Sequence, residues 1–306
     1  MEVKPATTYE QQIEKLRERG CYIRDERIAE RILSQLNYYR FSAYFLPFRK
    51  EDETYREGTD FMTVYLIYEF DREMRLLLLG ALEQVEIFMR SHLAYFHAHT
   101  YGPLGYENSG NYDKKHKHST FMKNFNREVE NNKKSPLVQH HKAHYGGKFP
   151  IWAAVELFTF GMTSKFFADL PRAKRIEFAN SVIFENERKV QSWLKCCTDL
   201  RNTCAHYGRL YYRRFSSIPA SPDGWQKMGQ MLFDEIIAVK MLYPDCNVWN
   251  DVYCEGIKRL ISKYGNAINL NAIGFPEGWE DALIKAPPRG TSRESGKEKE
   301  LVTSAN

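Results

Sequence analysis

The segment 192–214 carries the side chains whose types and spacing best fit a chemical role. Arg201 is followed five positions later by His206, and Asn202 lies four positions before His206 on the same helical face. The long Arg201 side chain can swing back toward the imidazole, and the Asn202 amide can orient that ring. Apolar residues at helical spacing predict a helix over 187–206 with one buried side, formed by Trp193, Leu194, Cys197, Leu200 and Cys204.

These residue types match what the cleavage of RNA requires. RNA carries its own nucleophile, the 2′-hydroxyl, so an enzyme has to move protons and neutralise charge on the phosphorus centre. An imidazole serves as base or acid near neutral pH, and a guanidinium offers a charged fork to phosphate oxygens. The scheme requires no metal ion, so we expect no metal or other cofactor. The alternative is a structural ion pair of Arg201 with Asp199 or Glu156.

The residues around this helix end favour a nucleic-acid partner. Between Asp199 and Arg214 the charged side chains are all cationic, and tyrosines stand between them. Cations contact phosphates and aromatic rings stack on unpaired bases, so RNA contacts are expected at Arg209, Tyr211, Arg213 and Arg214. One chain supplies one such imidazole, whereas a base and an acid should flank the phosphate. We therefore expect a two-fold homodimer that faces the two helices together.

A basic segment at 111–148 holds nine Lys or Arg, three acids and five of the nine histidines. We expect a short helix within 121–130 and a mobile chain elsewhere. Lys114, Lys115 and Lys117 are predicted phosphate contacts, with a solvated loop as the alternative. His140, His141 and His144 have metal-like spacing, but no Cys or acid nearby completes a shell. An RNA-facing patch that includes His140 and His141 is therefore favoured.

A second arginine and histidine pair lies upstream. Arg90 and His97 are seven residues apart and share a helical face, which favours an RNA contact at Arg90 and leaves a second catalytic centre as an alternative. Glu83 and Glu86 could form a carboxylate pair. The spacing of Glu86 and Arg90 instead favours an ion pair on the helix surface, as it does for 71 and 75.

The elements that position these residues are predicted to be helices, because no segment shows strand alternation between turn residues. The fold class is all-α. Helical periodicity predicts two short helices around Gly20, a long helix over 61–101 with a break near Gly80, and a buried helix after Pro150. Further helices are expected over 172–186, 187–206, 223–242 and 250–264.

Composition and length restrict the class of protein. With 306 residues, 43% hydrophobic and 27% charged, the chain is neither disordered nor a coiled-coil rod. The run 76–82 is too short to cross a bilayer and no signal peptide precedes it, so we expect a cytoplasmic protein without a membrane partner. Six cysteines without a C-x-x-C pair indicate reduced thiols. We expect an N-terminal helical region (1–60), a core (61–215) with the basic insert, C-terminal helices (216–285) and a disordered tail (286–306).

Two sets of residues resemble known families. RNTCAH (201–206) resembles the motif of HEPN-domain ribonucleases, in which Arg, a polar residue and His follow one another with four to six positions between Arg and His. Ordered blocks within 7–215 resemble Abi-like proteins, the AbiD/AbiF abortive-infection group of bacterial phage defence. The blocks are TTYEQQIEKLRERG (7–20), NYYRFSAYFLPF (37–48), YEFDREMRLLLLGALEQVEIFMRSHLAYFHAHTYGP (68–103), PIWAAVELFTFGMTSKFF (150–167) and SWLKCCTDLRNTCAHYGRLYYRR (192–214).

The resemblance implies a HEPN-like helical bundle with additional helices, and a metal-independent, toxin-like endoribonuclease that dimerises. Carried over by position, Arg201 and His206 are the catalytic pair and Asn202 is the polar residue of the motif. The alternative function is a non-catalytic RNA-binding module that docks a structured small non-coding RNA. Such an RNA could also restrain the enzyme.

Overall fold

The computed structural model describes residues 5–225 and 227–286. Within those ranges the regular structure is helical, with isolated β-bridges but no strand, which confirms the all-α prediction. None of the helices described is both long and apolar enough to span a membrane. The tail predicted for 286–306 lies outside the described residues, apart from Ala286.

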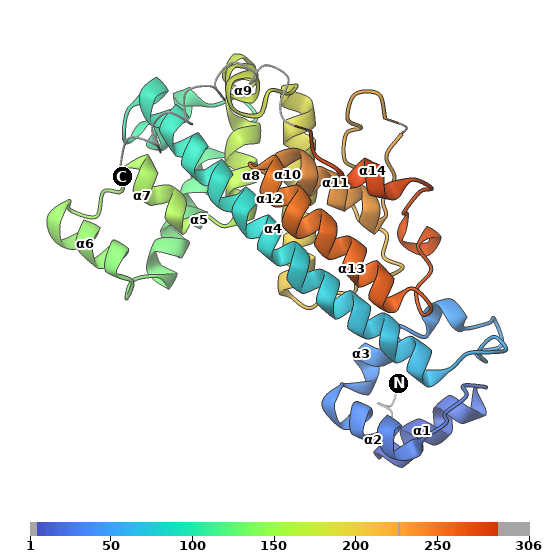
Figure 1. Cartoon of the computed structure of the whole chain (residues 1–306). Helices are drawn as coiled ribbons and strands as arrows, with labels where there is room; N and C mark the ends of the chain where they lie inside the picture. Colours follow the sequence, from blue (N-terminus) through green and yellow to red (C-terminus); the bar gives the residue numbers. More distant parts are fainter. Residues whose placement is uncertain (1–4, 226, 287–306) are drawn as a thin grey trace, which may run out of the picture.

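The long helix α4 (Phe61–Tyr101) forms the axis of the molecule (Figure 1). It begins where the Asp60 carboxylate accepts a hydrogen bond from the Thr63 N–H, and it ends at Gly102, whose φ of 82° favours glycine. Both ends match the prediction. The break expected near Gly80 does not occur, because one glycine costs a helix interior only about 1 kcal/mol and α4 is packed against α10 and α13.

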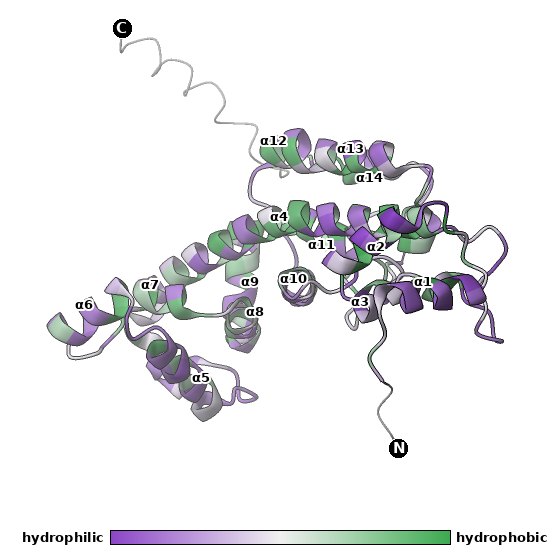
Figure 2. Cartoon of the chain, turned by 90° about the horizontal axis from the view of Figure 1, so that it is seen from below, coloured by the Kyte–Doolittle hydropathy of each residue, from purple (hydrophilic) through white to green (hydrophobic). Residues whose placement is uncertain are grey.

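The other helices pack around this axis. Figure 2 shows α13 (Glu255–Tyr264) on one side of α4, with α10 (Glu187–Ala205) on the opposite side. Three short helices lie near the start of α4 and three near its end (Figure 1). The former are α1 (Tyr9–Glu18), α2 (Glu26–Gln35) and α3 (Tyr38–Ser42), and the latter are α5 (His118–Asn131), α6 (Pro136–His144) and α7 (Ile151–Ala154). The remaining α-helices are α8 (Phe160–Asp169), α9 (Arg172–Phe178), α11 (Leu232–Leu242), α12 (Cys246–Val248) and α14 (Trp279–Leu283).

The basic segment 111–148 differs from the prediction of a mostly mobile chain. It folds into α5 and α6 and joins the body of the protein through buried apolar side chains. Phe121 and Phe125 of α5 contact Phe158, and Val138 of α6 is fully buried. The few apolar residues of this segment are therefore enough to fix it against the core.

Several helix boundaries also differ. The helix expected after Pro150 is divided into α7, a 3₁₀ turn and α8, since the Thr159 hydroxyl caps α8 by accepting from the Met162 N–H. The segment 172–186 is α-helical only as far as Phe178 and continues as a π-helical turn. The segment 223–242 becomes helical only at Leu232, and 250–264 has a π-helical turn before α13. The two short helices predicted around Gly20 are α1 and α2.

Helix α10 presents one side to the core and the other to the surface. All five residues of its predicted apolar stripe are buried, which confirms that part of the sequence analysis. The helix contacts α4, α8 and α11. Arg201 and Asn202 therefore lie at the boundary of the core or outside it, near the C-terminal end of the helix.

Candidate functional site

The chain turns sharply where α10 ends. His206 is the C-cap residue, and Tyr207 follows with a left-handed φ of 58°, which stops the helix. The Gly208 N–H then donates to the Thr203 carbonyl at 2.7 Å. A Cβ at position 208 would lie 3.0 Å from that carbonyl oxygen, so the tight return requires glycine here. The turn leaves the His206 side chain exposed to solvent.

The loop after His206 is fixed to α4 by one buried carboxylate. Asp71 forms an ion pair with Arg75 and accepts three hydrogen bonds, from the Tyr44 hydroxyl at 2.6 Å and from the N–H groups of Leu210 and Tyr211 at 3.1 and 2.8 Å. Burial raises the pKa of the Asp71 carboxyl, and the Arg75 guanidinium opposes that shift. Sequence analysis placed this pair on the surface, which is wrong. The sequence feature that could have shown the burial is the position of this charged pair on the apolar side of the long helix.

Arg201 is held by a carboxylate from α4. One guanidinium nitrogen, Nη2, lies 3.4 Å from Glu86 Oε2, and the other, Nη1, donates to the Asn202 side-chain oxygen at 3.1 Å. The second Glu86 oxygen pairs with Arg90, as predicted, but Glu86 is buried and the pair does not lie on the helix surface. Arg90 also donates to the Phe158 carbonyl. The structural partner of Arg201 is therefore Glu86. The amide of Asn202 meets this guanidinium, whereas sequence analysis expected it to orient the imidazole.

Two hollows flank this end of α10. Arg201, Glu86 and Arg90 line an open groove of about 600 Å³, which we call the arginine groove. Tyr207 and Arg40 line a second hollow of about 560 Å³, and both hollows include Leu79. The His206 ring has no hydrogen-bond or ionic partner among the described residues. A free imidazole and a guanidinium with a side-chain exposure of 32% thus lie at the same end of the helix, beside a recess.

The sequence matches the family of Abi-like proteins over residues 31–212. This range covers more than half of the chain and includes α4, α8 and α10 together with Arg201 and His206. The chain belongs to the Abi-like protein family. The resemblance to Abi-like proteins is thereby confirmed, and the match includes every quoted block except 7–20 and the last two residues of 192–214. No curated protein and no solved structure matches the chain.

The other residues predicted to contact RNA around α10 of this Abi-like protein fall into two groups. Arg213 and Arg214 are exposed. Arg209 instead donates to the Ala43 carbonyl and so ties the loop to α3. Tyr211 is fully buried, and its hydroxyl is engaged by the backbone of Asn269. Its ring cannot stack on a base in this structure, so Tyr211 is a core residue and not an RNA contact.

The basic segment of the Abi-like chain offers several of its predicted contacts to solvent. Lys114, Lys115 and Lys117 are exposed just before α5, and His140 is exposed on α6. His141 is half-buried and stacks on Phe149, with the ring centroids 5.1 Å apart. Across 5–225 and 227–286, no group of three or more His, Cys, Asp or Glu side chains is placed to hold a metal ion.

The second arginine and histidine pair is not an accessible site. His97 is fully buried among Tyr101, Tyr112 and Phe166, and burial lowers the pKa of its imidazole to about 4. A neutral ring without solvent contact is a packing residue. Arg90 itself lines the arginine groove, so it belongs to the site at the end of α10.

Proposed function

We propose that this Abi-like protein is a metal-independent endoribonuclease of the abortive-infection type, a toxin-like enzyme that cleaves host or phage RNA. The observation that supports this proposal most directly is the placement of Arg201 and His206. Both side chains reach solvent at the C-terminal end of α10, and Arg90 adds a second guanidinium to the groove that Arg201 lines, whereas His206 lines neither hollow. Membership of a family named for abortive infection agrees with a role in phage defence.

The chemistry uses the 2′-hydroxyl of the RNA. Its oxygen attacks the adjacent phosphorus while its proton passes to an imidazole base, and the bond from phosphorus to the 5′-oxygen breaks. The departing 5′-oxygen takes a proton from an acid, which leaves a 2′,3′-cyclic phosphate and a 5′-hydroxyl. Arg201 neutralises charge on the non-bridging oxygens. The Asn202 amide holds that guanidinium through the 3.1 Å hydrogen bond.

The proposed active form is a homodimer, since a single His206 cannot flank both sides of the phosphate. Large apolar side chains around the site support such an interface. Tyr207 and Leu76 are 68% and 59% exposed, and Ile87 beside Arg201 is 49% exposed. A cluster of exposed apolar groups on one face is typical of a protein contact.

A second candidate function is a non-catalytic RNA-binding module that docks a structured small non-coding RNA. The observation that favours it is the ion pair between Glu86 and Arg201, because a guanidinium held by a carboxylate is less available to a phosphate. The exposed cations, such as Lys114, Lys115 and Arg214, serve RNA binding whether or not the RNA is cut.

Substitution at the motif tests the proposal. We expect Arg201→Ala and His206→Ala each to reduce RNA cleavage by about 10²–10⁴-fold and to remove toxicity on expression. Arg27→Ala on α2 and His99→Ala on α4 are the controls, because both side chains are exposed and lie outside the grooves beside α10. Circular dichroism should show that all four variants are folded.

Three results would contradict the ribonuclease. These are an unchanged cleavage rate in His206→Ala, strict dependence of cleavage on an added divalent metal, and products without a 2′,3′-cyclic phosphate. Wild-type protein that binds RNA tightly but never cuts it would establish the RNA-binding alternative.

A further inference from the structure

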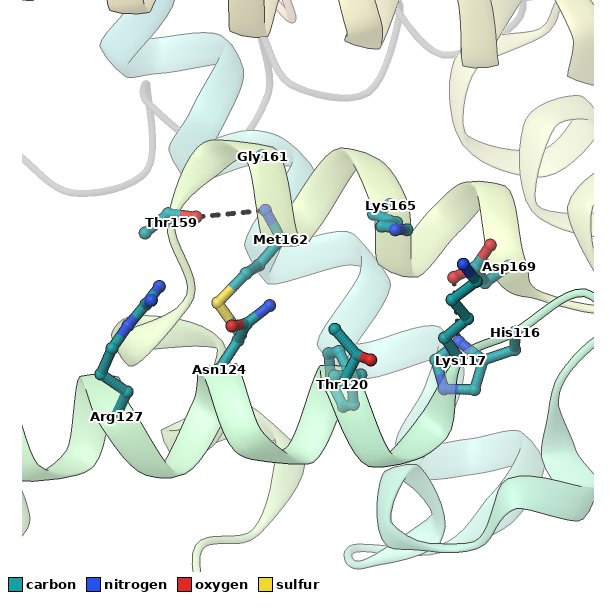
Figure 3. A pocket seen from close by; sticks show the side chains of 11 residues that line it. His116, Lys117, Thr120, Asn124, Arg127, Thr159, Gly161, Met162, Lys165 and Asp169 are labelled. Atoms are coloured by element: carbon teal, nitrogen blue, oxygen red, sulfur yellow. Dashed lines mark hydrogen bonds and ion pairs between the residues drawn. The ribbon is translucent and has the colours of Figure 1, made fainter.

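Two recesses flank α8. The first, of about 220 Å³, lies between α5 and α8, and the second, of about 500 Å³, lies between α8 and α10. Both are lined by Gly161 and Lys165, so they adjoin each other across α8, and we call the two recesses together the channel. In Figure 3, α5 and α8 run antiparallel with their polar side chains facing each other.

The channel is lined by cations from three helices. Five exposed cations form what we call the basic track: Lys117 at the N-cap of α5, Arg127 of α5, Lys165 of α8, and Arg188 and Lys195 of α10. Among the described residues the three lysines form no ion pair, and each arginine meets only the glutamate next to it in sequence, at 3.5 Å for Arg127 and 4.0 Å for Arg188. The charge of the track is therefore available to a ligand.

The carboxylates in the channel are already engaged. Asp169 lies 2.9 Å from Nδ1 of His116, whose side chain is only 3% exposed, and Asp199 accepts hydrogen bonds from the hydroxyls of Ser216 and Ser217. Thr120 and Asn124 add neutral hydrogen-bonding groups between the cations of α5 (Figure 3). Spaced cations with hydroxyl and amide groups between them suit the sugar–phosphate backbone of a nucleic acid.

The track leads toward the proposed catalytic residues. Thr198 lines the channel, whereas Arg201, one turn further along α10, lines the arginine groove. Likewise Thr159 lines the channel and Glu156, three residues earlier, lines the arginine groove. Arg188 and Asn202 are separated by about 21 Å along the helix at 1.5 Å per residue. A strand of several nucleotides can therefore occupy the track while its continuation reaches the end of α10.

We infer that the basic track holds single-stranded RNA by its phosphates, on one side of the bond that Arg201 and His206 cleave. This inference rests on the proposed function for the identity of the nucleic acid. A single strand is the occupant because the channel is a recess between packed helices, into which one backbone fits. Since the lining groups are cations and short polar side chains, the track contacts phosphates and not base edges.

The test measures RNA binding by full-length His206→Ala protein, which keeps the RNA intact. The probe is an unstructured RNA of about 20 nucleotides, longer than the sites of single-strand binding folds. The track variant carries Lys117→Gln, Lys165→Gln and Lys195→Gln. The matched control carries Lys123→Gln, Lys134→Gln and Lys148→Gln, which remove the same charge from exposed positions outside the channel.

We expect the plot of log affinity against log salt to flatten by about two units in the track variant, with about 100-fold weaker binding near 0.1 M salt. The control variant should retain most of the slope of log affinity against log salt. Gly161→Gln, which places a side chain in the channel without changing charge, should also weaken binding. In the wild-type background, the track substitutions should raise the KM for a long RNA.

Equal losses in the track and control variants would overturn the track and leave the ribonuclease proposal standing, provided that wild-type protein still cuts RNA. Displacement of the RNA by a mononucleotide at stoichiometric concentration would assign the recess to a free nucleotide and overturn the inference. Equal binding of a duplex, with equal sensitivity to the track substitutions, would overturn the single-strand assignment. Failure of the His206→Ala parent to bind any RNA would overturn both proposals.

Discussion

At the residue scale, the carboxylate of Glu86 lies between the two guanidinium groups that the proposed chemistry needs, those of Arg90 and Arg201. A phosphate entering the arginine groove has to compete with this carboxylate for Arg201. Glu86→Gln keeps the shape and a hydrogen-bond acceptor but removes the charge. We expect RNA to bind about fivefold more tightly near 0.1 M salt, because one more cation becomes free for a phosphate.

Glu83→Gln is the control for this prediction, since Glu83 lines the same groove but is exposed and forms no ion pair with any residue that the structure describes. A screened surface charge should change affinity far less. Titration of fluorescently labelled RNA against each protein, in the His206→Ala background, gives the comparison. Weaker binding by Glu86→Gln would mean that Glu86 mainly positions Arg201 and does not compete with the phosphate.

Residue spacing alone predicted the pair Arg201 and His206, and it identified Glu86 as the partner of Arg90, because such relations are local to one helix. It could not identify Glu86 as the partner of Arg201, since that contact joins two helices 115 positions apart in the chain. Tyr211 was misassigned for the same reason. Its sequence neighbours are cationic, but the loop turns its ring toward Phe70 and buries it.

At the scale of elements, Asp71 connects α4 to the loop that follows α10. Asp71→Asn leaves Arg75 buried without its carboxylate partner, so we expect a loss of about 3–5 kcal/mol in the free energy of unfolding. Tyr44→Phe removes one of the hydrogen bonds to the carboxylate and should cost about 1 kcal/mol. Urea unfolding of both variants measures these values.

The two variants should also differ in activity. Because the backbone after His206 is held by Asp71, Asp71→Asn should lower kcat for cleavage even below its melting temperature, while Tyr44→Phe should retain most of it. Equal stability losses in the two variants, or full kcat in Asp71→Asn, would show that the carboxylate does not fix the loop.

The boundaries of α4 were predictable because local residues determine them, namely the cap at Asp60 and the glycine at 102. The absence of a break at Gly80 was not predictable, because it depends on how α4 packs against helices far away in the chain, such as α13. The division of the segment after Pro150 likewise depends on a cap at Thr159 and on Arg90, which donates to the Phe158 carbonyl. Contacts between elements distant in sequence thus decide where a helix ends, even where the hydrophobic periodicity of the sequence predicts that it continues.

At the scale of the whole molecule, the basic track and the hollows that hold the exposed apolar side chains are lined by different residues around α8 and α10. The basic track lies between α5, α8 and α10, whereas Leu76, Ile87 and Tyr207 lie along α4 and the end of α10. This separation lets a second protomer cover the apolar face without displacing RNA from the track. It also places Arg201 and His206 at the edge of the proposed protein interface.

A shared active site makes a prediction that a monomeric site does not. Mixing His206→Ala chains with wild-type chains, with subunit exchange verified, produces heterodimers that hold one imidazole. If the base and the acid come from different protomers, these heterodimers are strongly impaired, and excess variant suppresses cleavage below simple dilution. A parallel mixture with His99→Ala chains controls for the exchange itself, because that side chain is exposed on α4 and lines neither hollow beside α10. Cleavage that falls only in proportion to the wild-type chain would mean that each protomer cuts alone, and His206 would then need another proton-transfer partner within its own chain.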